Sequence, residues 1–361
     1  MIQATCVNCR RTLDYRRMDY ICPLCGGIYD IPNMVWNHTI HSERPGLLKY
    51  APFFGLESED DLITLGEGST PLISDDYQGV KLYHKMESNT PTGSYKDRGT
   101  VVLINYLRKY QHKLVVEDSS GNAGASLAAY AARSGIKARI YIPESASGPK
   151  MAQIEAYGAK VVKIPGTRQN AADAVKKEAD GGVIYASHAY MPMGLLGIAT
   201  IAYELYASLG EEIGTIITPV GHGGLLLGVM RGFVALKNAG LISKLPFFIG
   251  AQAENCSPVA EMFANTMEGS SMTGSTVAEG VRVTRPVRGG AIIEFLQKNN
   301  GIIVKVPESL ILPGYIDLAR RGIHLEPTSA LCWAAMKKHI AKLEQPIVLI
   351  QTGAGLKYQN K

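Results

Sequence analysis

Strand-like and helix-like segments alternate along most of this sequence, and the alternation restricts the folds open to it. We expect strands over 80–87, 114–117, 138–142, 159–164, 182–186, 215–220, 247–252, 302–306 and 347–351. Helix-like segments separate several of them, over 123–134, 150–157, 171–179 and 194–209. Chains built in this way form parallel sheets with helices on both faces. The sequence therefore predicts an α/β fold.

The composition is that of a globular protein and argues against several classes of partner. Of the 361 residues, 46% are hydrophobic and 19% are charged, as in ordinary soluble domains. The net charge of +5 comes from 37 basic and 32 acidic residues without a long basic block, so nucleic-acid binding is not indicated. No apolar run approaches the roughly 20 residues that span a bilayer, and residues 1–5 do not resemble a signal peptide. We therefore expect a cytoplasmic protein without nucleic-acid or membrane partners.

Four of the six cysteines lie within the first 25 residues, at Cys6, Cys9, Cys22 and Cys25. Two Cys-x-x-Cys pairs in a chain without an export signal favour a zinc site with four thiolate ligands. Because the protein would fill every coordination position, the zinc would be structural. Reduced cysteines without a metal are the alternative. We interpret residues 1–32 as a small zinc ribbon, and Cys256 and Cys332 as ordinary buried residues.

Lys96 follows a glycine-containing turn at 88–95 and begins an apolar, helix-like run. A lysine that is held at such a turn and partly desolvated can form an imine with an aldehyde cofactor. For Lys96 alone, a solvated surface lysine is the simpler alternative. Three further motifs, at 119–124, 221–225 and 352–356, favour the reactive role.

Two of these motifs have the position and composition of anion sites. Residues 221–225, Gly-His-Gly-Gly-Leu, connect an expected strand to a helix, where backbone N–H groups and the helix dipole bind phosphate. A dinucleotide site is the alternative, but no suitable acidic residue follows on the next strand. Ser119, Ser120 and Asn122 occupy the equivalent position after an earlier strand and could hold a carboxylate. There the alternative is an ordinary helix cap.

Together these motifs resemble the fold-type II family of pyridoxal phosphate enzymes, and their order is most similar to that of the threonine synthase type. The resemblance covers nearly the whole chain. Its motifs are 66–72, 90–99, 119–135, 279–282, 326–330 and 352–357. It implies two doubly wound parallel-sheet domains, and an N-terminal zinc ribbon occurs in some members. The implied bounds are 1–32 for the ribbon, 33–84 with 166–361 for a large cofactor-binding domain, and 85–165 for a small substrate-clamping domain.

The resemblance also implies a role for each motif. Lys96 would form an imine with pyridoxal phosphate and then move protons. Asn122 would bond the cofactor's phenolic oxygen, and Thr352 would face its pyridine nitrogen. The cofactor's phosphate would be bound by Gly221, His222, Gly223, Gly224 and Leu225. Ser119, Ser120 and Asn122 would hold the carboxylate of an amino-acid substrate.

For the threonine synthase type the implied reaction converts O-phospho-L-homoserine and water to threonine and phosphate. This chain departs from the type because its glycine loop lacks asparagines, and 189–194 lack an expected asparagine and arginine. Lys150 stands where the family places a phosphate-binding lysine, and His188 and His222 could supply the missing charge. Elimination or replacement at the β-carbon of serine, threonine, phosphoserine or diaminopropionate is therefore an alternative, and a non-catalytic regulatory protein is a further one. Relatives of this fold type are commonly homodimers. We expect 265–276 to be a mobile loop.

Overall fold

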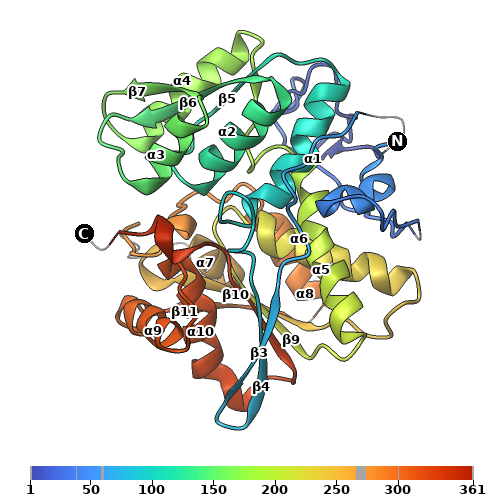
Figure 1. Cartoon of the computed structure of the whole chain (residues 1–361), viewed down its shortest axis with the longest axis vertical. Coiled ribbons are helices and arrows are strands. Elements are labelled where there is room, and N and C mark those ends of the chain that lie inside the picture. Colours follow the sequence, from blue (N-terminus) through green and yellow to red (C-terminus); the bar gives the residue numbers. More distant parts are fainter. Residues whose placement is uncertain (1, 38, 58–60, 266–273, 300, 360–361) are drawn as a thin grey trace. The chain divides into compact units, whose positions relative to one another are not determined.

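The computed structural model describes residues 2–37, 39–57, 61–265, 274–299 and 301–359 (Figure 1). The chain divides into two compact units, each made of two stretches. Unit 1 comprises Met1–Gly68 and Thr90–Thr200, and unit 2 comprises Ser69–Asn89 and Ile201–Lys361. The bounds of these two units differ from those of the three predicted domains. The assignment of metal, cofactor and substrate binding to separate domains stays a prediction. Most of the expected mobile loop at 265–276 lies outside the described residues.

Unit 1 is built on a four-stranded parallel sheet in the order β7-β6-β5-β8. Its strands are β5 (Leu114–Glu117), β6 (Lys137–Pro143), β7 (Lys160–Ile164) and β8 (Ile184–Tyr185). Its helices are α1 (Lys96–Lys109), α2 (Asn122–Ser134), α3 (Pro149–Ala156) and α4 (Arg168–Asp180), and α5 (Gly194–Leu209) begins here. The predicted alternation is confirmed, because each of these four strands lies within two residues of its expected bounds at either end.

The packing of α5 on α1 depends on glycine. A Cβ at Gly197 would lie 1.8 Å from the carbonyl oxygen of Arg98, and one at Gly99 would lie 3.2 Å from the carbonyl oxygen of Gly194. Such distances are below van der Waals contact, so only glycine lets the two backbones approach this closely. In addition, Arg98 donates a hydrogen bond to Thr200 Oγ1 at 2.9 Å. The N-terminal turn of α1 is therefore held firmly.

Unit 2 contains a six-stranded sheet in the order β11-β10-β9-β12-β4-β3. The strands are β3 (Leu72–Tyr77), β4 (Val80–Lys85), β9 (Thr215–Pro219), β10 (Phe247–Ala253), β11 (Ile302–Val306) and β12 (Ile347–Ile350). All pairs are parallel except β3 with β4. The helices are α6 (Gly224–Asn238), α7 (Pro258–Ala264), α8 (Gly289–Lys298), α9 (Glu308–Arg320) and α10 (Pro327–His339).

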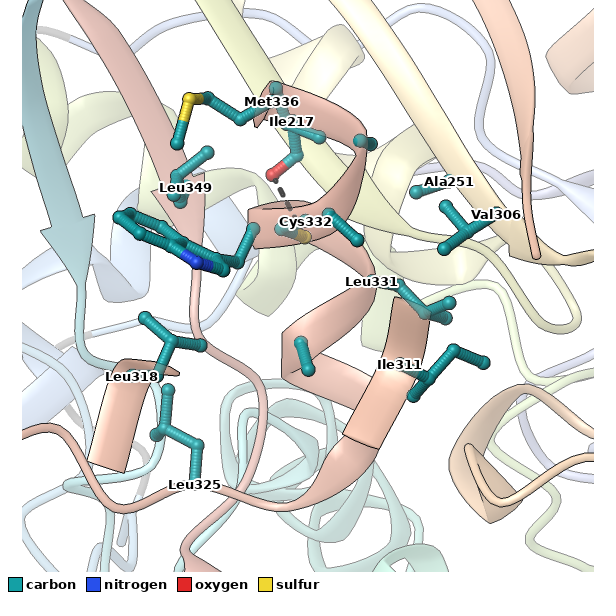
Figure 2. Packing of buried hydrophobic residues seen from close by; sticks show 14 of the residues in the cluster. Ile217, Ala251, Val306, Ile311, Leu318, Leu325, Leu331, Cys332, Met336 and Leu349 are labelled. Atoms are coloured by element: carbon teal, nitrogen blue, oxygen red, sulfur yellow. Dashed lines mark hydrogen bonds between the residues drawn. The ribbon is translucent and has the colours of Figure 1, made fainter. Parts of the chain in front are cut away.

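The core of unit 2 surrounds α10, which is buried along most of its length. Figure 2 shows Cys332 of α10 among side chains of the sheet and of α9, including Ile217, Ala251 and Val306. Its thiol donates to the carbonyl oxygen of Ile217 at 3.5 Å, and burial raises its pKa. Cys332 is thus an ordinary buried residue, as predicted, and Cys256 is buried as well.

Short elements complete the chain. In the N-terminal segment, β1 (Thr5–Cys6) pairs antiparallel with β2 (Tyr29–Asp30). Single 3-10 turns or short 3-10 helices cover Gly46–Phe54, Glu254–Cys256, Glu279–Val281, Ile340–Lys342 and Gly355–Lys357. Within the described ranges, every helix is too short or too polar to cross a membrane.

Candidate active site

The sheet of unit 1 changes its winding direction between β5 and β8. From β5 the chain continues to β6 and β7 on one side (Figure 1). It then returns to place β8 on the other side of β5. Ligands of open α/β sheets bind outside the carboxyl ends of the strands at such a switch point. Residues 118–122 follow β5 and 186–188 follow β8, so Ser119, Ser120, Asn122 and His188 lie at the switch point of their own unit.

Unit 2 has a switch point of the same kind between β9 and β12, because β10 and β11 extend the sheet on one side of β9 and β12 lies on the other. The glycine loop 221–225 follows β9 directly, and Thr352 stands two residues after the end of β12. The motifs that the sequence singled out in this half therefore also meet at the position where this class of sheet binds ligands.

Lys96 is the first residue of α1 and is half-buried. Its Nζ donates to Tyr95 Oη at 2.7 Å and lies 4.5 Å from the centroid of that ring. The adjacent Asp97 is fully buried, accepts from the backbone N–H and Oγ1 of Thr92, and accepts from Ser126 of α2 at 2.7 Å. These bonds fix the backbone that carries Lys96. Sequence reasoning did not single out Tyr95.

The start of α2 lacks the side-chain cap of an ordinary helix within the described ranges. Gly121 is its N-cap, and no side-chain capping bond is present there among the described residues. Ser119 Oγ instead accepts from the Gly121 N–H at 3.2 Å. A Cβ at Gly124 would lie 1.9 Å from the Ser119 carbonyl oxygen, so glycine is required for this tight turn. The first-turn N–H groups are thus suited to an anion.

The glycine loop of unit 2 has the same character at the start of α6. Gly223 is the N-cap with φ of +98°, and in the described part of the chain no side chain caps it. A Cβ at Gly223 would lie 2.3 Å from Ile292 Cδ1, so a larger residue would also have to displace the end of this side chain of α8. The carbonyl oxygen of His222 accepts from the Arg288 N–H at 3.1 Å, which fixes the loop.

Thr352 lies in a buried polar group that joins the end of β12 to the start of α10. Its N–H donates to Ser329 Oγ at 2.9 Å, and its Oγ1 lies 3.1 Å from the same oxygen. Thr352 Oγ1 also donates to Glu326 Oε1 at 3.3 Å. The sequence marked 326–330 as a motif but gave no role to Glu326 or Ser329.

His188 has a partner that sequence reasoning missed. Its Nδ1 lies 3.4 Å from Oε1 of Glu117, the last residue of β5. The Glu117 side chain is 1% exposed, and its Oε2 has no hydrogen-bond partner among the described residues. Burial, and secondarily Asp118, raise the pKa of Glu117 well above its ordinary value, against the attraction of Lys96 and Arg168. An acidic residue at the end of an otherwise apolar strand was the available signal. Lys150, the other predicted substrate residue of unit 1, lies in the first turn of α3.

The four N-terminal cysteines converge as predicted. The four sulfur atoms lie within 4.8 Å of one another, with 3.4 Å between Cys6 and Cys25 and 3.6 Å between Cys9 and Cys22. Tetrahedral ligands at a Zn–S distance of about 2.3 Å are spaced similarly. A Cβ at Gly27 would lie 2.7 Å from the Cys6 sulfur, so glycine leaves room for this sulfur. The cluster is therefore compatible with a metal ion.

Comparisons with known proteins agree with this geometry. Residues 63–353 match the family described as pyridoxal-phosphate dependent enzymes. The chain is 34% identical over 374 residues to a threonine synthase of Methanocaldococcus jannaschii, covering 98% of this chain and 92% of that protein. Among solved structures, a threonine deaminase of T.th. is 27% identical with a TM-score of 0.66, covering 81% of this chain and 94% of its own. A serine racemase of Dictyostelium discoideum is 26% identical with a TM-score of 0.66, covering 80% and 92%.

Proposed function

This chain belongs to the family of pyridoxal-phosphate dependent enzymes, and we propose that it is a lyase of the threonine synthase type that converts O-phospho-L-homoserine and water to L-threonine and phosphate. The observation that carries this proposal is its likeness, over nearly its full length, to a threonine synthase. The position of the predicted motifs at the switch points of both sheets supports it.

The residues present suit pyridoxal phosphate. Lys96 offers a half-buried amine for the aldehyde, and the uncapped start of α6, lined by Gly221 to Leu225, offers N–H donors for the phosphate. In this proposal Asn122 bonds the phenolic oxygen and Thr352 faces the ring nitrogen. When bound, the cofactor withdraws electrons from the substrate's Cα and makes the proton there acidic.

Unit 1 would hold the substrate and move its protons. Ser119, Ser120 and Asn122 surround the uncapped start of α2, which we assign to the substrate's carboxylate. Lys96 Nζ would take the proton from Cα and then one from Cβ. Lys150 and His188 would attract the substrate's phosphate, in place of the asparagine and arginine absent from 189–194. We assign no substrate contact to His222, which lies in the cofactor loop of unit 2.

A second candidate keeps the cofactor and changes the amino acid. The similar solved structures are named as a threonine deaminase and a serine racemase, and the glycine loop lacks asparagines. Elimination or replacement at the β-carbon of serine, threonine, phosphoserine or diaminopropionate would use the same Lys96 and the same carboxylate site.

We further propose that the cysteine cluster binds one structural zinc ion, because all four coordination positions would be filled by thiolates. A homodimer is the assembly expected from the resemblance to other fold-type II enzymes. Size-exclusion chromatography with light scattering tests the assembly directly, and a monomeric mass would exclude a dimer.

Product analysis tests the proposed function. The protein is reconstituted with pyridoxal phosphate and incubated with O-phospho-L-homoserine, and phosphate and threonine are both measured. Equal amounts of the two products are expected, and Lys96→Ala should form neither. A spectral change with serine or diaminopropionate, without turnover of the phosphorylated substrate, would assign the protein to the second candidate. No visible imine band after reconstitution would contradict both.

A further inference from the structure

The switch point of unit 1 carries a pair of titratable groups that the proposed roles leave unexplained. Glu117 ends β5, His188 follows β8, and the two strands are neighbours in the sheet. Oε1 of Glu117 lies 3.4 Å from His188 Nδ1. The side chain of Glu117 is 1% exposed, whereas that of His188 is 26% exposed. Since Nδ1 faces the buried carboxyl, Nε2 lies on the opposite edge of the imidazole ring.

A buried carboxyl group with an oxygen that lacks a partner is costly when it is charged. Oε2 of Glu117 is such an atom within the described ranges, and burial raises the pKa of this group. The carboxyl therefore tends to keep a proton or to share one with His188. Two titratable groups whose surroundings shift their proton affinities are a common source of acid–base pairs in enzymes.

The other groups that face Glu117 come from several elements. Asp118, the next residue along the chain, repels the negative charge of the Glu117 carboxylate. It accepts a 2.6 Å hydrogen bond from the Tyr185 hydroxyl of β8. Lys96 of α1 and Arg168 of α4 are close enough to attract the carboxylate. Glu117 in turn contributes to raising the pKa of Tyr185, whose main cause is burial. The reactive lysine and the pair therefore belong to one electrostatic environment.

We propose that Glu117 and His188 share a proton that serves the oxygen atoms of the reaction, while Lys96 serves the carbon atoms. Glu117 would be a positioning residue that holds the imidazole with Nδ1 inward, and His188 Nε2 would exchange the proton with the substrate. This inference rests on the proposed function and names a division of labour at the same site. It also explains why an acidic residue stands beside a lysine in a site that takes an anionic substrate.

The proton balance of the proposed reaction closes with this division. As the bond between Cγ and the bridging oxygen breaks, the oxygen keeps the electron pair, receives the proton of His188 Nε2, and leaves as hydrogen phosphate. Because an amine carries only one extra proton, Lys96 would release the Cα proton to solvent water before it takes the Cβ proton. It would give the Cβ proton to Cγ and take one proton back from the water for Cα. The water that adds at Cβ gives its second proton back to His188. The pair ends in its starting state, and no oxidant or reductant is needed.

The test compares Glu117→Gln with the neighbouring change Asp118→Asn, which removes a carboxylate that bonds Tyr185 instead of His188. Two rates are measured in the reconstituted enzyme: phosphate release, and exchange of the substrate's Cα proton with deuterium from the solvent. General acid–base groups contribute about 10²- to 10⁴-fold, so in Glu117→Gln we expect phosphate release to fall about 10²-fold. The Cα exchange should stay within about threefold. Asp118→Asn should keep the wild-type ratio of the two rates.

A second readout needs neither cofactor nor turnover. Imidazole signals of the cofactor-free protein are titrated by NMR, and the His188 signal is assigned by its absence from His188→Asn. In Glu117→Gln the pKa of His188 should fall, because an amide cannot stabilise the imidazolium ion as a carboxylate does. His188→Asn should also reproduce the selective loss of phosphate release, which keeps the test decisive if Glu117→Gln folds poorly.

The outcomes separate the two proposals. Equal losses of both rates in Glu117→Gln and His188→Asn, or no loss in either, would overturn the proton-sharing pair. A wild-type enzyme that exchanges no Cα proton with any of the candidate amino acids would overturn the proposed function instead. If the wild type exchanges the proton of O-phospho-L-homoserine but releases no phosphate, the substrate is wrong. Serine is then used as the substrate, and ammonia release is measured in place of phosphate release. The ratio of ammonia release to Cα exchange should fall in Glu117→Gln in the same way, since a leaving hydroxyl group also needs a proton.

Discussion

Glu117 and Asp118 are adjacent carboxyl groups whose surroundings give them different properties. Glu117 is enclosed at the end of β5, whereas Asp118 is half-buried and receives the Tyr185 hydroxyl proton in a 2.6 Å hydrogen bond. A hydrogen bond to the charged form favours that form, and burial disfavours it. One residue of separation along the chain thus decides how deeply a carboxyl group is buried and which side chain bonds it.

Replacing Glu117 by Gln should stabilise the protein at alkaline pH. In the folded protein the pKa of Glu117 lies well above its ordinary value of 4.5, chiefly because of burial. Between the two values the folded chain binds a proton that the unfolded chain has lost, so the free energy of unfolding falls as pH rises through this window. The neutral amide avoids this loss. Urea unfolding at pH 8 should therefore give Glu117→Gln a higher midpoint than wild type, and the difference should disappear near pH 4.

The control for this measurement is Asp118→Asn, which weakens the bond from Tyr185. A hydrogen bond to a charged group contributes about 1.5–3 kcal/mol, so this variant should be less stable than wild type at pH 8. If Glu117→Gln is also less stable there, its carboxyl group is charged and well accommodated in the folded protein, and the proton-sharing interpretation loses its electrostatic basis. Stabilisation with lost activity is the usual signature of a group kept for function.

At the scale of elements, the alternation of strands and helices was predictable because it depends on local periodicity and on glycines that end helices. The edge strand β3 escaped prediction, since its polar residues, Asp75 and Asp76 among them, give no apolar alternation. Its antiparallel pairing with β4 is a tertiary feature. Helix α10 is buried on nearly all sides, so it lacks the one-sided apolar stripe of a surface helix.

The candidate site was predictable to a similar extent. Lys96 and the two glycine-containing loops have local signatures, because a strand, a turn and a helix follow one another directly in the sequence. The partners of these residues have no local signature in the sequence. Tyr95 is recognised only by its bond to Lys96, and Glu326 reaches Thr352 from 26 residues away. Glu117 contacts His188 only because β5 and β8 pair in the sheet. This strand order cannot be predicted from the local sequence of either segment.

The contact between α1 and α5 gives a prediction about Gly197. An added methyl group would lie 1.8 Å from the Arg98 carbonyl oxygen, so Gly197→Ala must separate the two helices. Overpacking of this kind costs about 1–3 kcal/mol, occasionally more, and the shifted α1 should weaken cofactor binding at Lys96. Thermal unfolding followed by circular dichroism measures the loss of stability.

Gly290→Ala is the matched control for Gly197→Ala. Gly290 is also in a helix, α8, but the described structure has no atom within 4 Å of an added Cβ. Alanine there should raise stability by up to about 1 kcal/mol, through its higher helix propensity. If both variants lose the same stability, the cost reflects the loss of glycine in general, and the close approach of α1 and α5 is not important.

The N-terminal cysteines yield a prediction about metal content. We expect about one zinc ion per chain, measured by elemental analysis of the purified protein. Cys22→Ser should lose it. Burial acts to raise the pKa of the Cys22 thiol, but hydrogen bonds from the backbone, Cys9 and Cys25 outweigh it and lower the pKa to about 6, which favours the thiolate that binds metal. Cys256→Ser should retain the metal, because Cys256 is buried elsewhere in unit 2. Zinc-free wild-type protein would leave the four residues as reduced thiols.

Both units contain the same arrangement of a switch point and an uncapped helix within the described residues, and the side chains around it differ between the units. Both sheets reverse their winding direction, and at both reversals a glycine turn opens a helix without a side-chain cap in the described chain. Unit 1 adds titratable groups to this arrangement, namely Lys96, Glu117 and His188. Unit 2 adds donors and hydroxyls, among them Thr352 and Ser329. In the proposed function, unit 1 would supply the imine and the proton transfers, and unit 2 would bind the cofactor's phosphate and face its ring nitrogen.

This separation predicts how two variants affect binding of pyridoxal phosphate. Lys96→Ala removes the amine of unit 1, so the visible imine band should vanish while the phosphate donors of unit 2 still bind the cofactor. Gly223→Ala should keep the amine but distort the loop, because alanine is strained at a φ of +98° and its Cβ would meet Ile292. The dissociation constant of Gly223→Ala for pyridoxal phosphate, measured by equilibrium dialysis, should rise about tenfold or more, since strain of this kind costs about 1–3 kcal/mol. Because both groups bind the same cofactor, the double variant measures their coupling. Contributions that are independent of each other would give the sum of both losses in binding free energy. A double variant no weaker than Lys96→Ala would mean that the loop binds only after the imine has formed, and the two units would then act in sequence.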